Sequence, residues 1–251
     1  MGTRLLTAAA LAALAAAAGE AVAQDYMIPA GTPGYIRAAV ESDERSSAMT
    51  ERDAARKPAH VLALSGIEPG DRVIEIAGFG NYYTTLLAAI VGAGGEVHMF
   101  DLPYTEGRSG EASRAFVAAH PNTTYNVVEY NEAEFPGDTD VAFNILYYHD
   151  LGLQDVDRAA MNAKIFAALR PGGRYVIIDH KAEDGSGWRD TESLHRMGVE
   201  VIVEEVTAAG FTLTADSDLL ANPDDARTQM VFAPGTRGAT DRALFVFTKP
   251  E

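Results

Sequence analysis

The sequence predicts an α/β fold in which a mostly parallel seven-stranded sheet carries helices on both faces. From about residue 50 onward, short apolar segments of strand length alternate with helical segments of roughly 10–15 residues, which is typical of βαβ units. The segment DVAFNILYY at residues 140–148 is almost continuously apolar, as expected of a strand buried on both faces. Right-handed crossovers between parallel strands then place helices on either side of the sheet.

Each element follows from its local pattern. Thr50 and Asp53 have the spacing of a capping box and predict the start of a helix, and Pro171-Gly172-Gly173 predicts a turn. The predicted strands are residues 72–77, 96–101, 124–129, 140–148, 174–179, 211–218 and 243–248. The predicted helices are residues 35–41, 50–65, 82–91, 106–119, 155–169 and 194–209.

The amino-terminal region differs from the rest in composition. Residues 1–23 combine Arg4, an apolar run at 5–18 and an A-x-A site before Gln24, which together predict a cleaved secretory signal peptide. The alternative is a retained membrane anchor, but the apolar run is short against the roughly 20 residues that span a bilayer. We therefore expect a periplasmic or secreted protein, with an arm at residues 24–49 and one domain at residues 50–251.

Composition excludes several classes of function. The 251 residues contain no cysteine, which excludes disulfides, thiolate metal ligands, iron–sulfur clusters and a cysteine nucleophile. The formal net charge of -16 argues against a nucleic-acid partner, because phosphates attract basic surfaces. We expect a small-molecule substrate, no nucleic acid and no membrane partner for the mature form; the oligomeric state does not follow from the sequence.

The first predicted strand leads into a turn of small residues. Residues 73–84 read VIEIAGFGNYYT, and Asp101 ends the next strand. A strand, a small-residue turn, a helix and an acidic residue at the end of the second strand form the arrangement that binds adenosine-containing cofactors.

These residues resemble the first motif of class I S-adenosylmethionine-dependent methyltransferases, an acidic residue followed by G-x-G-x-G. Glu75 aligns with the acid, and Ala77, Phe79 and Asn81 align with the glycines. More widely, residues 54–250 resemble a family of exported predicted methyltransferases of bacteria, through ARKPAHVLALSGIEPGDRV at 55–73, PGGRYVIIDHKA at 171–182 and LHRMGVEVIVEEVTAAGF at 194–211.

The resemblance implies a Rossmann-like class I methyltransferase fold with S-adenosylmethionine as cofactor. The cofactor-binding residues that it implies are Glu75, Ala77, Gly78, Gly80, Asp101 and Glu132. Phe79 departs from the pattern, and its side chain either blocks the methionine end of the site or turns outward.

Histidines follow the fourth and fifth strands. In methyltransferases of this fold the end of strand four often orients or deprotonates the acceptor, so the resemblance implies catalytic roles for His149 as general base, Tyr148 and His180. Alternatively, these histidines are only hydrogen-bonded to Asp150 or Asp179. A third interpretation is a metal site of His149, His180, His195 and a carboxylate; the spacing matches no recognised ligand pattern, and we predict no metal.

Three functions remain open from the sequence. The first is an exported methyltransferase for a small-molecule acceptor. The second is a protein of this fold that binds a periplasmic ligand without catalysis. The third is a hydrolase or lyase that uses the His149 and His180 rim. Fold alone does not decide among them, because function depends on the site.

Overall fold

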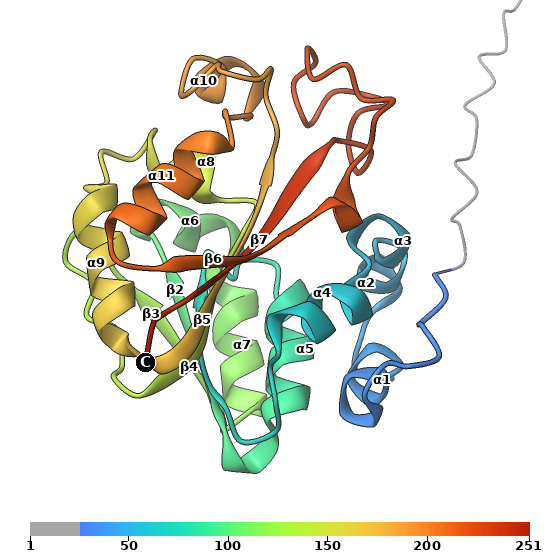
Figure 1. Cartoon of the computed structure of the whole chain (residues 1–251). Helices are drawn as coiled ribbons and strands as arrows, with labels where there is room; N and C mark the ends of the chain where they lie inside the picture. The colour runs from blue at the N-terminus through green and yellow to red at the C-terminus, as the bar shows by residue number, and fades with distance from the viewer. Residues whose placement is uncertain (1–25) are drawn as a thin grey trace, which may run out of the picture.

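The computed structural model describes residues 26–251, and the predicted signal peptide lies outside this range. Its centre is a seven-stranded sheet in the order β3-β2-β1-β4-β5-β7-β6 (Figure 1), which confirms the predicted fold class. Within residues 26–251, no helix is long and apolar enough to cross a membrane.

Every neighbouring pair of strands is parallel except the two pairs that involve β7, which runs antiparallel to β5 and β6. All seven predicted strands are present, with ends that shift by a few residues. The strands are β1 (Arg72–Ile76), β2 (Glu96–Asp101), β3 (Thr123–Val127), β4 (Thr139–Ile145), β5 (Leu169–His180), β6 (Thr212–Ser217) and β7 (Arg242–Thr248).

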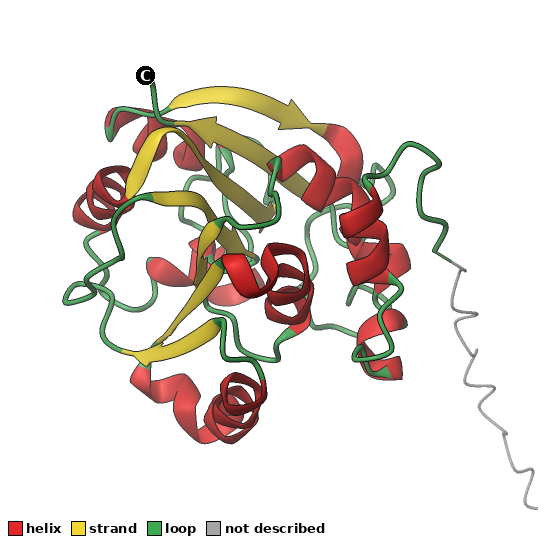
Figure 2. Cartoon of the chain, turned by 90° about the horizontal axis from the view of Figure 1, so that it is seen from below, coloured by secondary structure: helices red, strands yellow, loops and turns green. Residues whose placement is uncertain are grey.

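Helices cover both faces of the sheet, as the view from below makes clear (Figure 2). One layer holds α1 (Gly34–Val40), α2 (Ser47–Thr50), α3 (Asp53–Arg56), α4 (Pro58–Ser65), α5 (Tyr82–Val91) and α7 (Glu111–Ala119). The other holds α8 (Tyr148–Leu151), α9 (Arg158–Ala168) and α11 (Glu200–Ala208). The connections contain α6 (Pro103–Thr105), the π-helical turn η2 (Glu106–Gly110), α10 (Thr191–Leu194) and the 3-10 turns η1 (Gly92–Gly94) and η3 (Asp218–Leu220).

The core has one apolar cluster on each face of the sheet. On β1, Ile74 and Ile76 point into the cluster under α9 and α11, while Val73 points into the cluster under α4 and α5. A strand buried on both faces needs apolar residues at successive positions, which explains the continuous apolar run at β4. The packed sheet therefore supports the side chains at the ends of its strands.

The predicted helix at residues 50–65 is divided into separate short helices, so that prediction is wrong in detail. The residue before a proline is disfavoured in the α-helical region, so Lys57 does not continue the helix; it adopts a left-handed conformation with φ 45° that ends α3. The predicted capping box does not form either. Thr50 ends α2, and Asp53 is buried, where it accepts hydrogen bonds from Arg45 and Tyr82.

Two further boundaries differ from prediction. β5 begins at Leu169, so the predicted turn at residues 171–173 lies within an irregular part of that strand. The helix predicted at 194–209 begins only at Glu200. Before it, Met197 forms a bridge with Lys181 beyond the end of β5, and this pairing keeps the segment extended.

Candidate functional site

The carboxyl ends of β1, β2, β4 and β5 meet at one edge of the sheet, where α8 and α10 also lie (Figure 1). In open parallel sheets, ligands bind outside these ends, where the strand order reverses. Here the order reverses between β1 and β4, since β2 and β3 lie on one side of β1 and β4 and β5 on the other.

The turn between β1 and α5 has an unusual backbone. Ala77, Gly80 and Asn81 all have positive φ angles, of 58°, 84° and 53°, a conformation that glycine and asparagine adopt most readily. Phe79 does not belong to this group, so the turn does not require glycine there. A Cβ atom on Gly78 would lie 2.9 Å from Oε2 of Glu75. Gly80 is therefore required by its positive φ angle, and Gly78 by its close contact with Glu75. Both glycines lie one position away from those of the family motif.

Glu75 lies buried beneath this turn. Its Oε2 accepts a hydrogen bond of 2.7 Å from the hydroxyl of Thr84 on α5, which ties the strand to the helix. Burial raises the pKa of Glu75 to about 8, and the neighbouring carboxylate of Asp101 raises it further against the effect of the Thr84 bond. The side chain is therefore largely neutral at neutral pH and closes the floor of the turn.

Asp101 ends β2 beside the same turn and has no exposed surface. Neither of its carboxylate oxygens has a hydrogen-bond partner among residues 26–251. Burial raises the pKa of Asp101 to about 6, although the hydroxyl of Tyr125 and the N–H of Gly78 lie close enough to oppose the shift. Two unpartnered acceptor oxygens at the end of the second strand match the two hydroxyls of a ribose.

Aromatic side chains lie over the strand ends. Phe79 is 38% exposed and packs edge-on against Tyr147, which follows β4, at 5.8 Å between ring centroids. The ring has turned outward, one of the two orientations considered above. The hydroxyl of Tyr104, from the segment after β2, lies 3.0 Å from that of Tyr147. Because β1 lies between β2 and β4, this tyrosine pair spans the end of β1.

The predicted cofactor residues divide into a cluster and one outlier. Glu75, Ala77, Gly78, Gly80 and Asp101 lie together around the β1–α5 turn. Glu132 is an exposed residue of the loop after β3, where only its backbone N–H is bonded, to the carbonyl of Glu129. Its position in the loop after β3 is the one feature that supports a role in cofactor binding.

His149 forms a buried dyad with Asp179 at the ends of β4 and β5. Its Nδ1 lies 2.6 Å from Oδ1 of Asp179, and its backbone N–H donates to Oδ2 at 2.7 Å. The charge of Asp179 raises the pKa of His149 against the opposing effect of burial. A carboxylate only accepts hydrogen bonds, so Nδ1 carries a hydrogen and Nε2 of the neutral ring carries a lone pair.

Asp150 and His195 complete this cluster. Oδ1 of Asp150 lies 3.4 Å from Nε2 of His149 and 3.2 Å from Nδ1 of His195. Nε2 of His149 is buried and has no hydrogen-bond partner in the described part of the chain. In the neutral ring this nitrogen can accept a proton or coordinate a cation. Hydrogen bonding to Asp150 and Asp179 was one of the alternatives drawn from the sequence.

The structure gives Tyr148 and His180 other partners. The buried hydroxyl of Tyr148 donates to Glu205 on α11 and accepts from Asn162 on α9, so it is occupied in the helix layer. His180 Nδ1 lies 2.8 Å from the hydroxyl of Thr240. Burial lowers the pKa of His180 to about 3, which keeps its ring neutral. Of the three predicted catalytic residues, His149 has a buried nitrogen without a partner, Nε2, whereas His180 is bonded through Nδ1.

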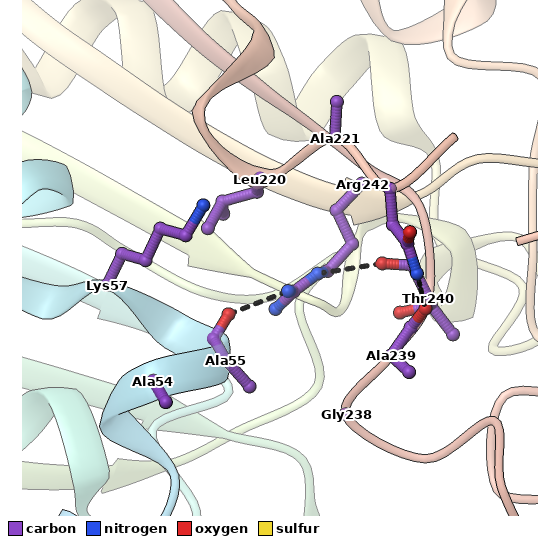
Figure 3. Close-up of a pocket in the computed structure, with 10 residues that line it drawn as sticks. Ala54, Ala55, Lys57, Leu220, Ala221, Gly238, Ala239, Thr240 and Arg242 are labelled. Atoms are coloured by element: carbon purple, nitrogen blue, oxygen red, sulfur yellow. Dashed lines mark hydrogen bonds between the residues drawn. The ribbon is translucent and has the colours of Figure 1, made fainter. Parts of the chain in front are cut away.

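A pocket of about 460 Å³, which was not predicted from the sequence, includes Thr240, the hydrogen-bond partner of His180, in its lining. It is lined by α3, the start of α4 and the segment before β7 (Figure 3). Arg242 donates to the carbonyls of Ala55 and Thr240, and Lys57 donates to that of Leu219. The lining residues include Lys57 and Arg242 but no carboxylate, so the pocket is positively charged although the protein as a whole is acidic. Its lining comes from segments far apart in sequence, which no local pattern reveals.

Comparisons with known proteins agree with this geometry. No known family profile matches the chain. The ubiquinone/menaquinone biosynthesis C-methyltransferase UbiE of Teredinibacter turnerae is 28% identical over 164 residues, which cover 62% of this chain and 59% of that protein. The chain thus spans less than two thirds of the length of this curated relative.

Solved structures share the fold. An S-adenosylmethionine-dependent methyltransferase from Mesorhizobium loti superposes with a TM-score of 0.56 at 17% identity, over 79% of this chain and 100% of that one. The [4+2]-cyclase SpnF superposes with a TM-score of 0.59 at 16% identity, over 84% of this chain and 85% of that one. The chain has the class I methyltransferase fold and resembles UbiE-type methyltransferases in sequence. The cyclase has the same fold but is named for a different reaction. Function must therefore be inferred from the residues of the site.

Proposed function

We propose that this protein is an S-adenosylmethionine-dependent methyltransferase that acts on a small-molecule acceptor. The observation that carries the proposal is Asp101, whose two buried carboxylate oxygens make no hydrogen bond of ordinary geometry within residues 26–251, although the hydroxyl of Tyr125 and the N–H of Gly78 lie nearby. Leaving a buried acceptor unpaired costs roughly 1–3 kcal/mol. A ribose diol placed here would remove that cost, which supports a ligand of this kind.

The chain's own residues divide the work of binding. Asp101 accepts hydrogen bonds from the ribose, and the backbone at Gly78 and Gly80 approaches the ligand where side chains would intrude. Glu132 is our candidate for the adenine amino group, on the basis of its place after β3. The cofactor supplies an electrophilic methyl group on a sulfonium centre. Because methyl transfer is an in-line displacement, the protein chiefly aligns donor and acceptor.

We place the methyl acceptor in the pocket near the start of β7, which is separated from β1 by β4 and β5. The pocket at Lys57 and Arg242 has a volume of about 460 Å³, within the range of roughly 300–1,000 Å³ usual for small-molecule sites. Strands lie about 4.8 Å apart, so three strand spacings place β7 roughly 14 Å from β1. That separation leaves room for a donor and a small acceptor side by side. The charge of -16 argues against a nucleic-acid acceptor.

We propose further that the enzyme is exported, on the strength of the predicted signal peptide at residues 1–23. An exported methyltransferase needs a supply of S-adenosylmethionine outside the cytoplasm. Export therefore requires both a functional signal peptide and a source of cofactor outside the cytoplasm. We test export separately from cofactor binding.

Calorimetric titration with S-adenosylhomocysteine tests the proposal. We expect saturable binding by the unmodified chain and a loss of about 1–3 kcal/mol, roughly 5- to 150-fold in affinity, for Asp101→Ala. Asp216→Asn on β6, at the far edge of the sheet, is the matched control and should bind unchanged. Absence of heat at millimolar ligand would contradict the proposal and favour a protein of this fold with another ligand.

A further inference from the structure

We propose that His149, Asp150 and His195 form a binding site for one divalent transition-metal ion. One ligand atom from each residue can be chosen so that all three lie within 4.8 Å of one another. Two imidazoles with one carboxylate are a donor set that suits zinc and similar divalent ions.

The two separations that involve Asp150 fit a tetrahedral ion, and the two histidine nitrogens lie within 4.8 Å of each other. Bonds of about 2.0–2.1 Å at tetrahedral angles place neighbouring ligand atoms roughly 3.3 Å apart. Oδ1 of Asp150 lies 3.4 Å from Nε2 of His149 and 3.2 Å from Nδ1 of His195. Three protein ligands leave the fourth position open to water or to a ligand oxygen, as in catalytic rather than structural sites.

A second and independent observation is the state of His149. The side chain is 3% exposed, and its Nε2 has no hydrogen-bond partner within residues 26–251 although it faces Asp150. Its other nitrogen is held by Asp179, which also accepts from the backbone N–H groups of His149 and His180. A carboxylate behind a metal-bound histidine fixes the ring and leaves the opposite nitrogen as the ligand.

The segment that carries His195 is also held firmly. His195 has a φ of 52°, a left-handed conformation that is uncommon for a residue other than glycine. Next to it, Arg196 is fully buried and bonds to Asp225 and to the carbonyls of Gln229 and Lys181. Strained backbone persists where the surroundings impose it, and such strain clusters at functional sites.

Charge and access support the same assignment. Asp150 and Asp179 bring two carboxylates to the cluster, and a divalent ion would offset their negative charge. The side chains of Asp150 and His195 are 20% and 30% exposed, so an ion can enter from solvent. The site lies at the ends of β4 and β5, away from Asp101 on β2, and its test does not depend on binding of an adenosyl ligand.

The test is metal binding by the full chain purified without a polyhistidine tag and treated with a chelator. Titration with Zn²⁺ followed by calorimetry should give one ion per chain, and Co²⁺ should give the intense visible absorption of a four-coordinate ion. Asp150→Asn and His195→Ala should each weaken Zn²⁺ binding at least about 100-fold, and Asp179→Asn about 10- to 100-fold. His98→Ala, which changes a histidine outside the cluster, should bind Zn²⁺ as the unmodified chain does.

Two results would overturn the proposed metal site. Less than one tenth of an equivalent of tightly bound Zn²⁺, or unchanged affinity in both Asp150→Asn and His195→Ala, would overturn the metal site and leave a hydrogen-bonded cluster. Circular dichroism of each variant shows that it has folded. Titration of the same samples with S-adenosylhomocysteine separates this failure from failure of the proposed function.

Discussion

Glu75 shows at the scale of a single residue how burial changes chemistry. Its carboxyl group lies under the β1–α5 turn with one bond from Thr84, and burial raises its pKa to about 8. The unfolded chain ionises this group near its ordinary value of 4.5. Between these two values the folded state binds the extra proton, so its stability falls as the pH rises.

We therefore predict that Glu75→Gln changes the pH dependence of stability. The contribution of Glu75 is fully present below about pH 4.5 and is lost as the pH rises through about 8. Relative to the unmodified chain, the variant should gain on the order of 3 kcal/mol between pH 5 and pH 9. Urea unfolding at both pH values measures this, with exposed Glu132→Gln as the control. Parallel stability profiles for Glu75→Gln and the unmodified chain would refute the assignment.

Single residues also show what a sequence can predict. The position of Asp101 follows from the strand pattern, because the last residue of a parallel strand lies at the ligand edge. That both its oxygens are buried without partners depends on contacts with distant segments, which no local pattern encodes. The same holds for His149: its place at the rim was predicted, whereas its bond to Asp179 was only one of several alternatives.

The segment between β2 and α7 is the element most closely linked to access. Tyr104 in this segment reaches Tyr147 after β4 with a hydroxyl separation of 3.0 Å, across the end of β1. Asp101, immediately before the segment, has no exposed surface. We therefore expect that a ligand reaches Asp101 by movement of this connection, which the tyrosine pair would oppose. The π-helical turn η2 lies in the same connection, and such turns are frequent at functional sites.

We predict that Tyr104→Phe strengthens binding of S-adenosylhomocysteine. A hydrogen bond contributes about 0.5–1.5 kcal/mol net, so its loss should raise affinity roughly 2- to 10-fold and speed association. Stopped-flow binding measures both quantities, and Tyr35→Phe on α1 is the control. Weaker binding by Tyr104→Phe would show instead that this hydroxyl contacts the ligand.

The connection after β5 depends on one buried ion pair. Arg196 bonds Asp225 at 2.8 Å and binds two backbone carbonyls, and it holds the extended segment that precedes α11. Arg196→Met should lower the free energy of unfolding by about 3–5 kcal/mol, because Asp225 would lose its partner. Urea unfolding measures this loss. Arg189→Met, which removes only exposed ion pairs, should cause no measurable change. Equal effects would show that Arg196 has no special structural role.

Element boundaries show where sequence reasoning fails. The central strands were predicted well because both of their faces are buried, so apolar runs mark them directly. The helix predicted at 50–65 divides at Lys57 because Pro58 restricts the residue before it. The helix predicted at 194–209 starts late because Met197 pairs with Lys181, a tertiary contact that overrides local helix preference.

The whole molecule is an acidic α/β domain whose predicted leader does not alter its charge. Arg4 and Glu20 are the charged side chains of residues 1–23 and cancel, so a chain cleaved at the predicted site would keep a net charge of -16. We predict that the native protein begins at Gln24, which amino-terminal sequencing checks. An intact Met1 in protein from the cell fraction would contradict export and leave the cofactor proposal untouched.

The central claim is that Asp101, at the end of β2, receives the ribose of an adenosyl ligand beside the β1–α5 turn. The most direct measurement is a crystal structure of the chain with S-adenosylhomocysteine. We predict the ribose hydroxyls within hydrogen-bond distance of both Asp101 oxygens, with the Tyr104–Tyr147 contact broken. A ligand bound elsewhere, with Asp101 still buried and unpartnered, would contradict the account.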